Sequence, residues 1–298
     1  MGTLQKIVVG HSFFPDGDIA LRSAITLAEH TKASLYILHV VEPYPLYQKM
    51  RFPSVPTETL LQEVVLKMQA QLSDMVKRPP LARLQTTTDV VVGKPFLELI
   101  RTCQRFQGDL LVVGTSARGK NRFLGSTGER VLRKAQVPVL ITKREFSTVP
   151  QTILVPTDFS TYSTTAVQEA ISLARSFSAR VVFLHVIDLQ YIYPSVVGGE
   201  PMMIPPVTAE DLEPEWQEFA KSLSLEGVIW EKRTEEGRAA TKIAEIAKET
   251  GAELIVIGTH GRTGIPHILL GSVAESVLRL AECSVLTIRP SAFQFEMP

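Results

Sequence analysis

The sequence predicts an α/β protein of two tandem domains, each built on a doubly wound parallel sheet. Three observations support this prediction. The chain has 298 residues, which is long for one core because domains most often contain roughly 100–150 residues. Similar segments recur at a nearly constant offset along the chain. Within each copy, runs of Val, Ile and Leu alternate with helical patterns, which is typical of parallel strands covered on both faces.

The repeat is visible in three matched pairs of segments. These pairs are KIVVGHS at 6–12 with TILVPTD at 152–158, LHV at 38–40 with LHV at 184–186, and GSTGERVL at 125–132 with GSVAESVL at 271–278. All three pairs are 146 residues apart. Between them the offset is 144, since DLLVVGT at 109–115 matches ELIVIGT at 253–259. The chain is therefore interpreted as a tandem duplication with domains at 1–146 and 147–298.

Five strands are expected in each half. They are predicted at 7–10, 34–40, 89–92, 109–114 and 138–142 in the first half and at 153–158, 180–186, 228–233, 253–258 and 284–288 in the second. Helical patterns separate them, and the one at 241–251 ends at Gly251, a typical left-handed stop. Cys103 falls on the apolar stripe of the matching first-half helix. We expect a Rossmann-like sheet of strand order 3-2-1-4-5 in each half.

Composition excludes several functional classes. Lys+Arg and Asp+Glu both count 31, so no overall basic field attracts nucleic acid or an acidic membrane surface. The two cysteines, Cys103 and Cys283, exclude a disulfide framework and suit a reducing compartment. The N-terminal apolar run is too short for a signal peptide or a spanning helix. We expect a soluble, cytoplasmic protein that neither binds nucleic acid nor inserts into a membrane.

A glycine-rich loop, GTHGRTGIPHILLGS at 258–272, follows the fourth strand of the second half. Open parallel sheets bind ligands at the carboxyl ends of their strands where strand order reverses, which lies between strands one and four. Glycine lets backbone N–H groups approach a phosphate, and a helix N-terminus favours the negative charge. A plain helix start is the competing interpretation, because Ser272 and Glu275, like Ser126 and Glu129, have capping-box spacing. Capping does not explain the other glycines or Arg262, so phosphate binding is favoured.

The pattern G-x2-G-x9-G-S, met by Gly258, Gly261, Gly271 and Ser272, is similar to the nucleotide-binding signature of the universal stress protein family. The resemblance covers nearly the whole chain as two copies. Nucleotide-binding members of that family hold ATP, often with a divalent ion such as Mg²⁺ or Mn²⁺, and act in stress response or regulation. The resemblance implies these binding residues: Pro156, Thr157, Asp158 and Val186 at the adenosine; Gly258, Thr259, Gly261, Arg262 and Gly264 near ribose and phosphates; Gly271, Ser272 and Val273 at the phosphate tail.

The first half departs from the family pattern, and its site is predicted to be degenerate. Ser12 replaces the aspartate and Ala117 replaces the second glycine. Two residues fewer separate Gly114 from Gly125 than separate the matching glycines of the second half. The segment GTSARGK resembles a P-loop, but Asn121 stands where a Ser or Thr would bind magnesium.

The favoured function is an ATP-binding stress-response or regulatory protein. One alternative is a nucleotide-free scaffold, and another is a slow ATPase with His260 or His267 near the phosphates. No catalytic set and no metal-ligand spacing is recognised. The Pro-rich, apolar connections at 42–56 and 188–206 are expected to be lids or contact surfaces. The last strand of each half is a sheet edge, through which we expect the halves to pair; a homodimer is left open.

Overall fold

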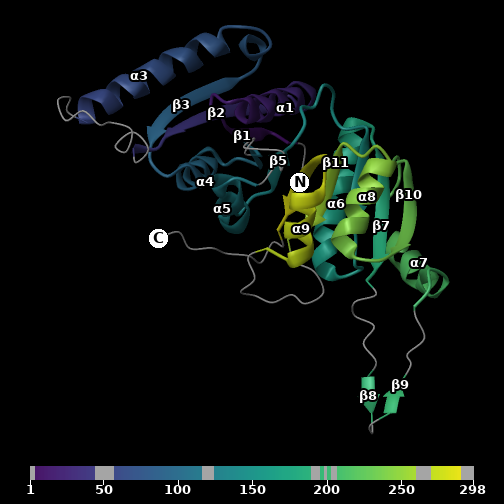
Figure 1. Cartoon of the computed structure of the whole chain (residues 1–298). Coiled ribbons are helices and arrows are strands. Elements are labelled where there is room, and N and C mark those ends of the chain that lie inside the picture. The colour runs from purple at the N-terminus through teal and green to yellow at the C-terminus, as the bar shows by residue number, and fades with distance from the viewer. Residues whose placement is uncertain are drawn as a thin grey trace. The chain divides into compact units, whose positions relative to one another are not determined.

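A computed structural model describes residues 4–43, 57–115, 124–188, 195–197, 200–202, 207–259 and 270–289 (Figure 1). The chain divides into two compact units between Val149 and Pro150. We call the unit before this division the first half and the unit after it the second half.

The described part of the first half alternates strands and helices. In chain order it contains β1 (Lys6–Gly10), α1 (Pro15–Thr31), β2 (Ser34–Val41), α3 (Thr57–Val76), the 3-10 turn η1 (Leu81–Arg83), β3 (Thr86–Val92), α4 (Pro95–Phe106), β4 (Leu110–Gly114), α5 (Ser126–Lys134) and β5 (Val139–Thr142). The strands pair in parallel in the order β3-β2-β1-β4-β5. This confirms the predicted order 3-2-1-4-5.

The described part of the second half repeats this arrangement. It contains β6 (Thr152–Pro156), α6 (Thr161–Phe177), β7 (Arg180–Ile187), β8 (Ser195–Val197), β9 (Glu200–Met202), η3 (Glu210–Leu212), α7 (Glu213–Lys221), β10 (Trp230–Glu236), α8 (Ala239–Glu249), β11 (Leu254–Gly258), α9 (Ser272–Leu280) and β12 (Ser284–Ile288). Its parallel order, β10-β7-β6-β11-β12, is again 3-2-1-4-5. The antiparallel pair of β8 and β9 lies inside the connection for which the sequence predicted no strand.

The change of offset is present in the elements themselves. β1 begins at Lys6 and β6 at Thr152, 146 residues later. β4 begins at Leu110 and β11 at Leu254, only 144 residues later. The structure therefore confirms the duplication that the sequence predicted.

Helices cover both faces of each sheet. Crossovers between parallel strands are right-handed. The helices that connect β1 to β2 and β2 to β3 therefore lie on one face of the sheet, and the helices that connect β3 to β4 and β4 to β5 lie on the other. The contacts agree with this rule: α1 packs on β1 and β4, whereas α4 and α5 pack on each other, as α8 and α9 do in the second half. The central strands are fully buried, as in β1 from Ile7 to Val9.

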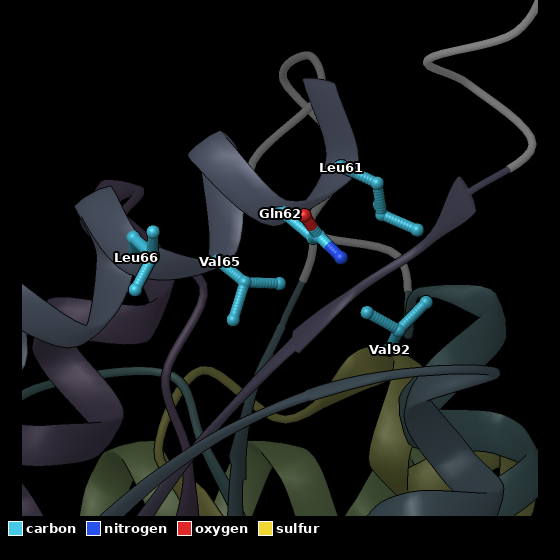
Figure 2. Close-up of a pocket in the computed structure, with 5 residues that line it drawn as sticks. All are labelled: Leu61, Gln62, Val65, Leu66 and Val92. Carbon is cyan, nitrogen blue, oxygen red and sulfur yellow. The ribbon is translucent and has the colours of Figure 1, made fainter. Parts of the chain in front are cut away.

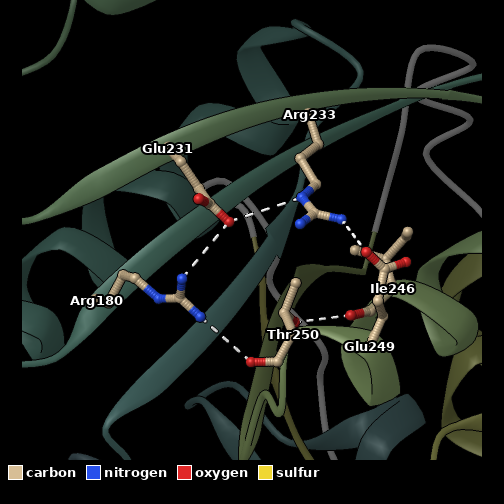
Figure 3. Close-up of polar contacts among 6 residues, drawn as sticks. All are labelled: Arg180, Glu231, Arg233, Ile246, Glu249 and Thr250. Atoms are coloured by element: carbon tan, nitrogen blue, oxygen red, sulfur yellow. Dashed lines mark hydrogen bonds and ion pairs between the residues drawn. The ribbon is translucent and has the colours of Figure 1, made fainter.

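The outermost strand of the second half, β10, is highly charged. Its sequence is WEKRTEE. Glu231 lies 3.8 Å from Arg180 and 3.6 Å from Arg233, whose guanidinium also contacts Glu249 at 2.6 Å (Figure 3). Such half-exposed ion pairs contribute about 0–1 kcal/mol each. We interpret their role as protection, because charges along an edge strand disfavour pairing with another chain.

Candidate functional site

The predicted site residues begin at the ends of three neighbouring strands of the second half. β6 lies between β11 and β7 in the sheet. Pro156 is the last residue of β6 and Gly258 the last of β11, and both are half-buried. Val186, near the end of β7, is also half-buried. Because the strands are parallel, these residues lie together at the carboxyl ends of the strands, as the sequence predicted.

Hydrogen bonds tie together the turn that follows β6. Thr157, which is buried, accepts a hydrogen bond from the backbone N–H of Phe159 through its Oγ1, with a donor–acceptor distance of 3.1 Å. The same oxygen lies 3.2 Å from Ser163 Oγ. Asp158 Oδ1 accepts hydrogen bonds from the backbone N and the Oγ of Ser160, at 3.0 and 2.6 Å. The Asp158 carboxylate is therefore held in one orientation at the end of the strand.

Ser160 has a second role, because it caps helix α6. Its Oγ accepts a hydrogen bond from the backbone N–H of Ser163 at 3.2 Å. A serine at this position satisfies one of the unpaired N–H groups of the first turn. The sequence prediction missed Ser160 and Phe159. The serine, placed directly before a helical pattern, was the signal that could have identified the cap.

The start of α9 is held against the end of β11. The backbone N–H of Thr259, which is fully buried, donates to Ile288 O at 2.9 Å. Thr259 O accepts in turn from the backbone N–H of Gly271 at 2.8 Å. A Cβ added to Gly271 would lie 3.2 Å from this carbonyl oxygen, so the close approach favours glycine here. The two ends of the glycine-rich loop are thus joined directly.

Ser272 starts the helix but does not cap it. The N-cap residue of α9 is Gly271, and no side chain among the described residues makes a cap hydrogen bond there. Glu275, which the capping box would direct toward the N-terminus, instead contacts Arg279 at 3.1 Å. The helix start at Ser272 was predicted correctly, and the capping box was wrong because the serine is the first helical residue. Ser272 and Val273 are both exposed at the helix N-terminus, where the backbone favours an anion.

Three predicted residues, Gly261, Arg262 and Gly264, lie outside the described residues. Within the part of the chain that the structure describes, no group of three or more His, Cys, Asp or Glu side chains is placed to hold a metal ion.

Comparison with known proteins gives the family. The model of the universal stress protein family matches residues 3–143 and again 150–289. The chain belongs to the universal stress protein family. A universal stress protein of Mycobacterium tuberculosis is 29% identical over 303 residues, covering 96% of each chain. One from Methanocaldococcus jannaschii is 36% identical over 137 residues, which cover 46% of this chain and 81% of the relative. Members of the family often bind nucleotides.

A solved structure shows the same fold over the full length. The universal stress protein of Archaeoglobus fulgidus superposes with a TM-score of 0.69, covering 95% of this chain and 96% of that chain at 18% identity. The tandem arrangement therefore occurs in other members of the universal stress protein family.

In the first half, a different pair of residues stands at the positions of Thr157 and Ser163. His11 stands at the position of Thr157, and Gly17 at the position of Ser163, each 146 residues earlier. A Cβ on Gly17 would lie 2.6 Å from Ser12 N, so the turn after β1 favours glycine at this position. The turn after β1 is also poorer in hydrogen bonds, because the buried Ser12 Oγ has no partner among the described residues.

His11 is buried with little compensation. Only 3% of the surface of His11 is exposed to solvent. Neither ring nitrogen has a hydrogen-bond partner within the described ranges. Asp18 Oδ1 lies 3.9 Å from its Nε2. Burial lowers the pKa of His11 below its ordinary value, and the Gly17 backbone and Asp18 offset only part of this effect. Burial likewise lowers the pKa of His39, against a smaller opposing effect of the His11 backbone. Both imidazoles are therefore favoured in the neutral form.

These two pKa shifts predict an acid-sensitive first half. The unfolded chain takes up protons as the pH falls below about 6.5, whereas the folded chain resists this uptake. Stability is therefore fully present above about pH 6.5 and declines below it. Urea unfolding followed by far-UV circular dichroism should give a lower midpoint at about pH 5.5 than at about pH 7.5.

The variant His11→Thr tests the assignment, because threonine does not titrate and is the residue at the matching position of the second half, Thr157. Gly17 is left unchanged, since a Cβ there would lie 2.6 Å from Ser12 N. We expect a smaller acid-induced shift in this variant than in the unaltered chain. His30→Asn serves as the control, since His30 is exposed. An identical acid shift in the His11→Thr variant and the unaltered chain would contradict the role given to His11.

Both cysteines are buried, and the apolar helix stripe of the sequence predicted this for Cys103. Cys103 is 2% exposed, and burial raises the pKa of its thiol to about 12. Cys283 is also buried. A thiol with so high a pKa as that of Cys103 is a poor nucleophile, because the thiolate is the reactive form.

A separate apolar hollow lies in the first half between α3 and the end of β3. Its volume is about 420 Å³, and its lining comprises Leu61, Gln62, Val65, Leu66 and Val92 (Figure 2). Leu66 is 65% exposed. None of the predicted site residues lines it. No helix in the described ranges is long and apolar enough to cross a membrane.

Proposed function

We propose that the chain is an ATP-binding regulatory or stress-response protein whose nucleotide is held by the second half. The supporting observation is the hydrogen bond between Thr259 O and Gly271 N. This bond holds the N-terminus of α9 at the end of β11, which neighbours β6 and the Asp158 turn. A positive helix end and a fixed carboxylate at adjacent strand ends suit a ligand with an anionic tail and a polar nucleoside.

Each part of the site has a distinct task in this proposal. The nucleoside contacts the turn from Pro156 to Asp158 and, on the neighbouring strand, Val186. Gly258, Thr259 and the loop residues Gly261, Arg262 and Gly264 approach the ribose and phosphates. Gly271, Ser272 and Val273 bind the phosphate tail, with backbone N–H groups and the Ser272 hydroxyl as donors. A divalent ion, Mg²⁺ or Mn²⁺, would accompany the phosphates.

Calorimetric titration with ATP and Mg²⁺ tests the proposal, after mass spectrometry has excluded nucleotide carried through purification. We expect one site per chain. Ser272→Ala should weaken ATP roughly tenfold because it removes one hydrogen bond to a charged group. Adding Gly261→Val should abolish measurable binding, since a branched side chain prevents close backbone approach.

The first half supplies a matched control. Ala117→Val with Ser126→Ala makes the same changes at the corresponding positions. ATP affinity should be unchanged in this control. Equal loss in both double variants, or no heat with unaltered protein, would contradict a nucleotide site in the second half.

A nucleotide-free scaffold is the second candidate, and the apolar hollow beside α3 favours it. Exposed apolar side chains such as Leu66 and Val92 are suited to protein contact. If the ATP titration fails, this surface is the place to test by substitution. Pairing of the two halves through their last strands, and a homodimer, stay predictions.

A further inference from the structure

A buried histidine forms a hydrogen bond to the backbone of the Asp158 turn. His185 Nδ1 lies 2.8 Å from Thr157 O, across a sequence separation of 28 residues. Because a carbonyl oxygen only accepts, the imidazole nitrogen is the donor. Phe159 stacks on the same imidazole, with ring centroids 4.5 Å apart and planes inclined by 18°. We call His185 and Phe159 the His–Phe brace of the second half.

The brace holds the backbone in a conformation that it would not adopt alone. Phe159 has a φ of 60°, in the left-handed region that bulky side chains rarely occupy. Such a conformation persists only where surrounding contacts impose it. Trp216 and Phe219 supply these contacts, because each packs edge-on against the Phe159 ring, at 4.9 and 5.6 Å.

Asp158 stands between the two residues that the brace holds. The carbonyl before it is bound by His185, and the residue after it is stacked on His185. The carboxylate itself is bound by Ser160. We infer that His185 and Phe159 are positioning residues, which place Asp158 for the nucleoside end of the bound nucleotide. This inference rests on the proposed function.

The first half contains a related histidine–phenylalanine pair without the aspartate, and its two rings meet edge-on instead of stacking. His39 Nδ1 lies 2.7 Å from His11 O, as His185 Nδ1 lies near Thr157 O. The Phe13 and His39 ring centroids are 4.8 Å apart, with the ring planes inclined by 68°. Phe13 also has a positive φ, of 56°. The residue between the braced positions is Ser12 rather than aspartate. The His39→Leu variant therefore removes the corresponding hydrogen bond at a turn that lacks the carboxylate.

The test compares ATP affinity in matched variants by calorimetric titration with Mg²⁺. His185→Leu keeps the bulk of the side chain but removes the donor, and we expect about tenfold weaker ATP binding. His185→Asn retains an amide donor near the position of Nδ1, and its affinity should stay within about threefold of the unaltered protein. His39→Leu should leave ATP affinity within about twofold.

Circular dichroism first establishes that each variant is folded. If His185→Leu is unfolded, Phe159→Gly replaces it, with Phe13→Gly as its control, because glycine tolerates the positive φ while removing the ring. Unchanged affinity in the His185→Leu or Phe159→Gly variant would overturn the inference. So would equal weakening by the His39 or Phe13 control, or failure of the Asn rescue. No ATP binding by the unaltered chain would instead overturn the proposed function, and this inference with it.

Discussion

Replacing Phe183 by alanine should destabilise the second half by about 3–5 kcal/mol, the usual range for a buried aromatic side chain. Phe183 lies in β7 and is fully buried. Its ring packs edge-on against Phe219 at 5.5 Å and against Trp230 at 5.9 Å. Alanine would leave a cavity beneath α7, since the strand backbone on which the ring stands is fixed by β6 and β10 on either side.

Tryptophan fluorescence reports this change selectively. The chain has two tryptophans, Trp216 and Trp230, and both belong to the second half. The midpoint of urea unfolding should fall at an unchanged slope. Ile229→Ala is the control, because Ile229 is 71% exposed and surface substitutions usually change stability by less than about 0.5 kcal/mol. A loss below about 1 kcal/mol for Phe183→Ala would contradict the role of this ring in the core.

Gly114→Ala should destabilise the first half by about 3 kcal/mol, at the upper end of the cost of overpacking. A Cβ built on Gly114 would lie 2.3 Å from the carbonyl oxygen of Asp16 and 2.8 Å from its carbon. These are backbone atoms in the first turn of α1, so no side-chain rotation relieves the contact. Either α1 or the end of β4 must move, and both belong to the core.

Gly128→Ala provides the matched control. Gly128 lies inside α5, and its added Cβ would be 3.4 Å from the nearest atom, Leu124 Cγ, which is an ordinary contact. We expect a gain of about 0.5–1 kcal/mol, because alanine favours the helix interior. Far-UV circular dichroism follows both variants, since the first half has no tryptophan. A Gly114→Ala midpoint equal to that of the unaltered chain would refute the close approach.

The Gly114 contact also affects how the glycine motif is interpreted. Gly114 corresponds to Gly258, the first glycine of the second-half pattern, 144 residues later. In the first half this glycine has a packing reason that is independent of any phosphate. The later glycine of the motif, Gly271, has its own close contact with Thr259 O. The proposed nucleotide site therefore rests on the hydrogen bond that joins the two ends of the loop, rather than on the number of glycines.

The fold could be predicted from the sequence because its determinants are local and repeated. Apolar runs such as those of β1 and β11 identify buried strands, and the shift of offset from 146 to 144 between the copies reappears in the elements themselves. The charged strand β10 was located less accurately. Its segment WEKRTEE is an edge strand that does not need apolar residues. The predicted strand, 228–233, begins two residues before the observed one and ends three residues before it.

The site could be predicted only in outline. Its residues at the ends of β6, β7 and β11 follow from parallel pairing, which the sequence pattern indicates. The state of Ser272 does not follow, because capping depends on the backbone angles of Gly271 and on where the serine side chain lies. A capping-box spacing alone cannot distinguish an N-cap serine from a first helical residue.

The duplication and the strand order follow from the sequence, because repeat spacing and hydrophobic periodicity can be read along the chain. The way in which the Asp158 turn is held follows only from the folded structure. His185 reaches Thr157 across 28 residues of sequence, and the positive φ of Phe159 is imposed by rings from other elements. Such contacts join residues that are distant in the sequence, and no local sequence pattern specifies which of them pack together in the core.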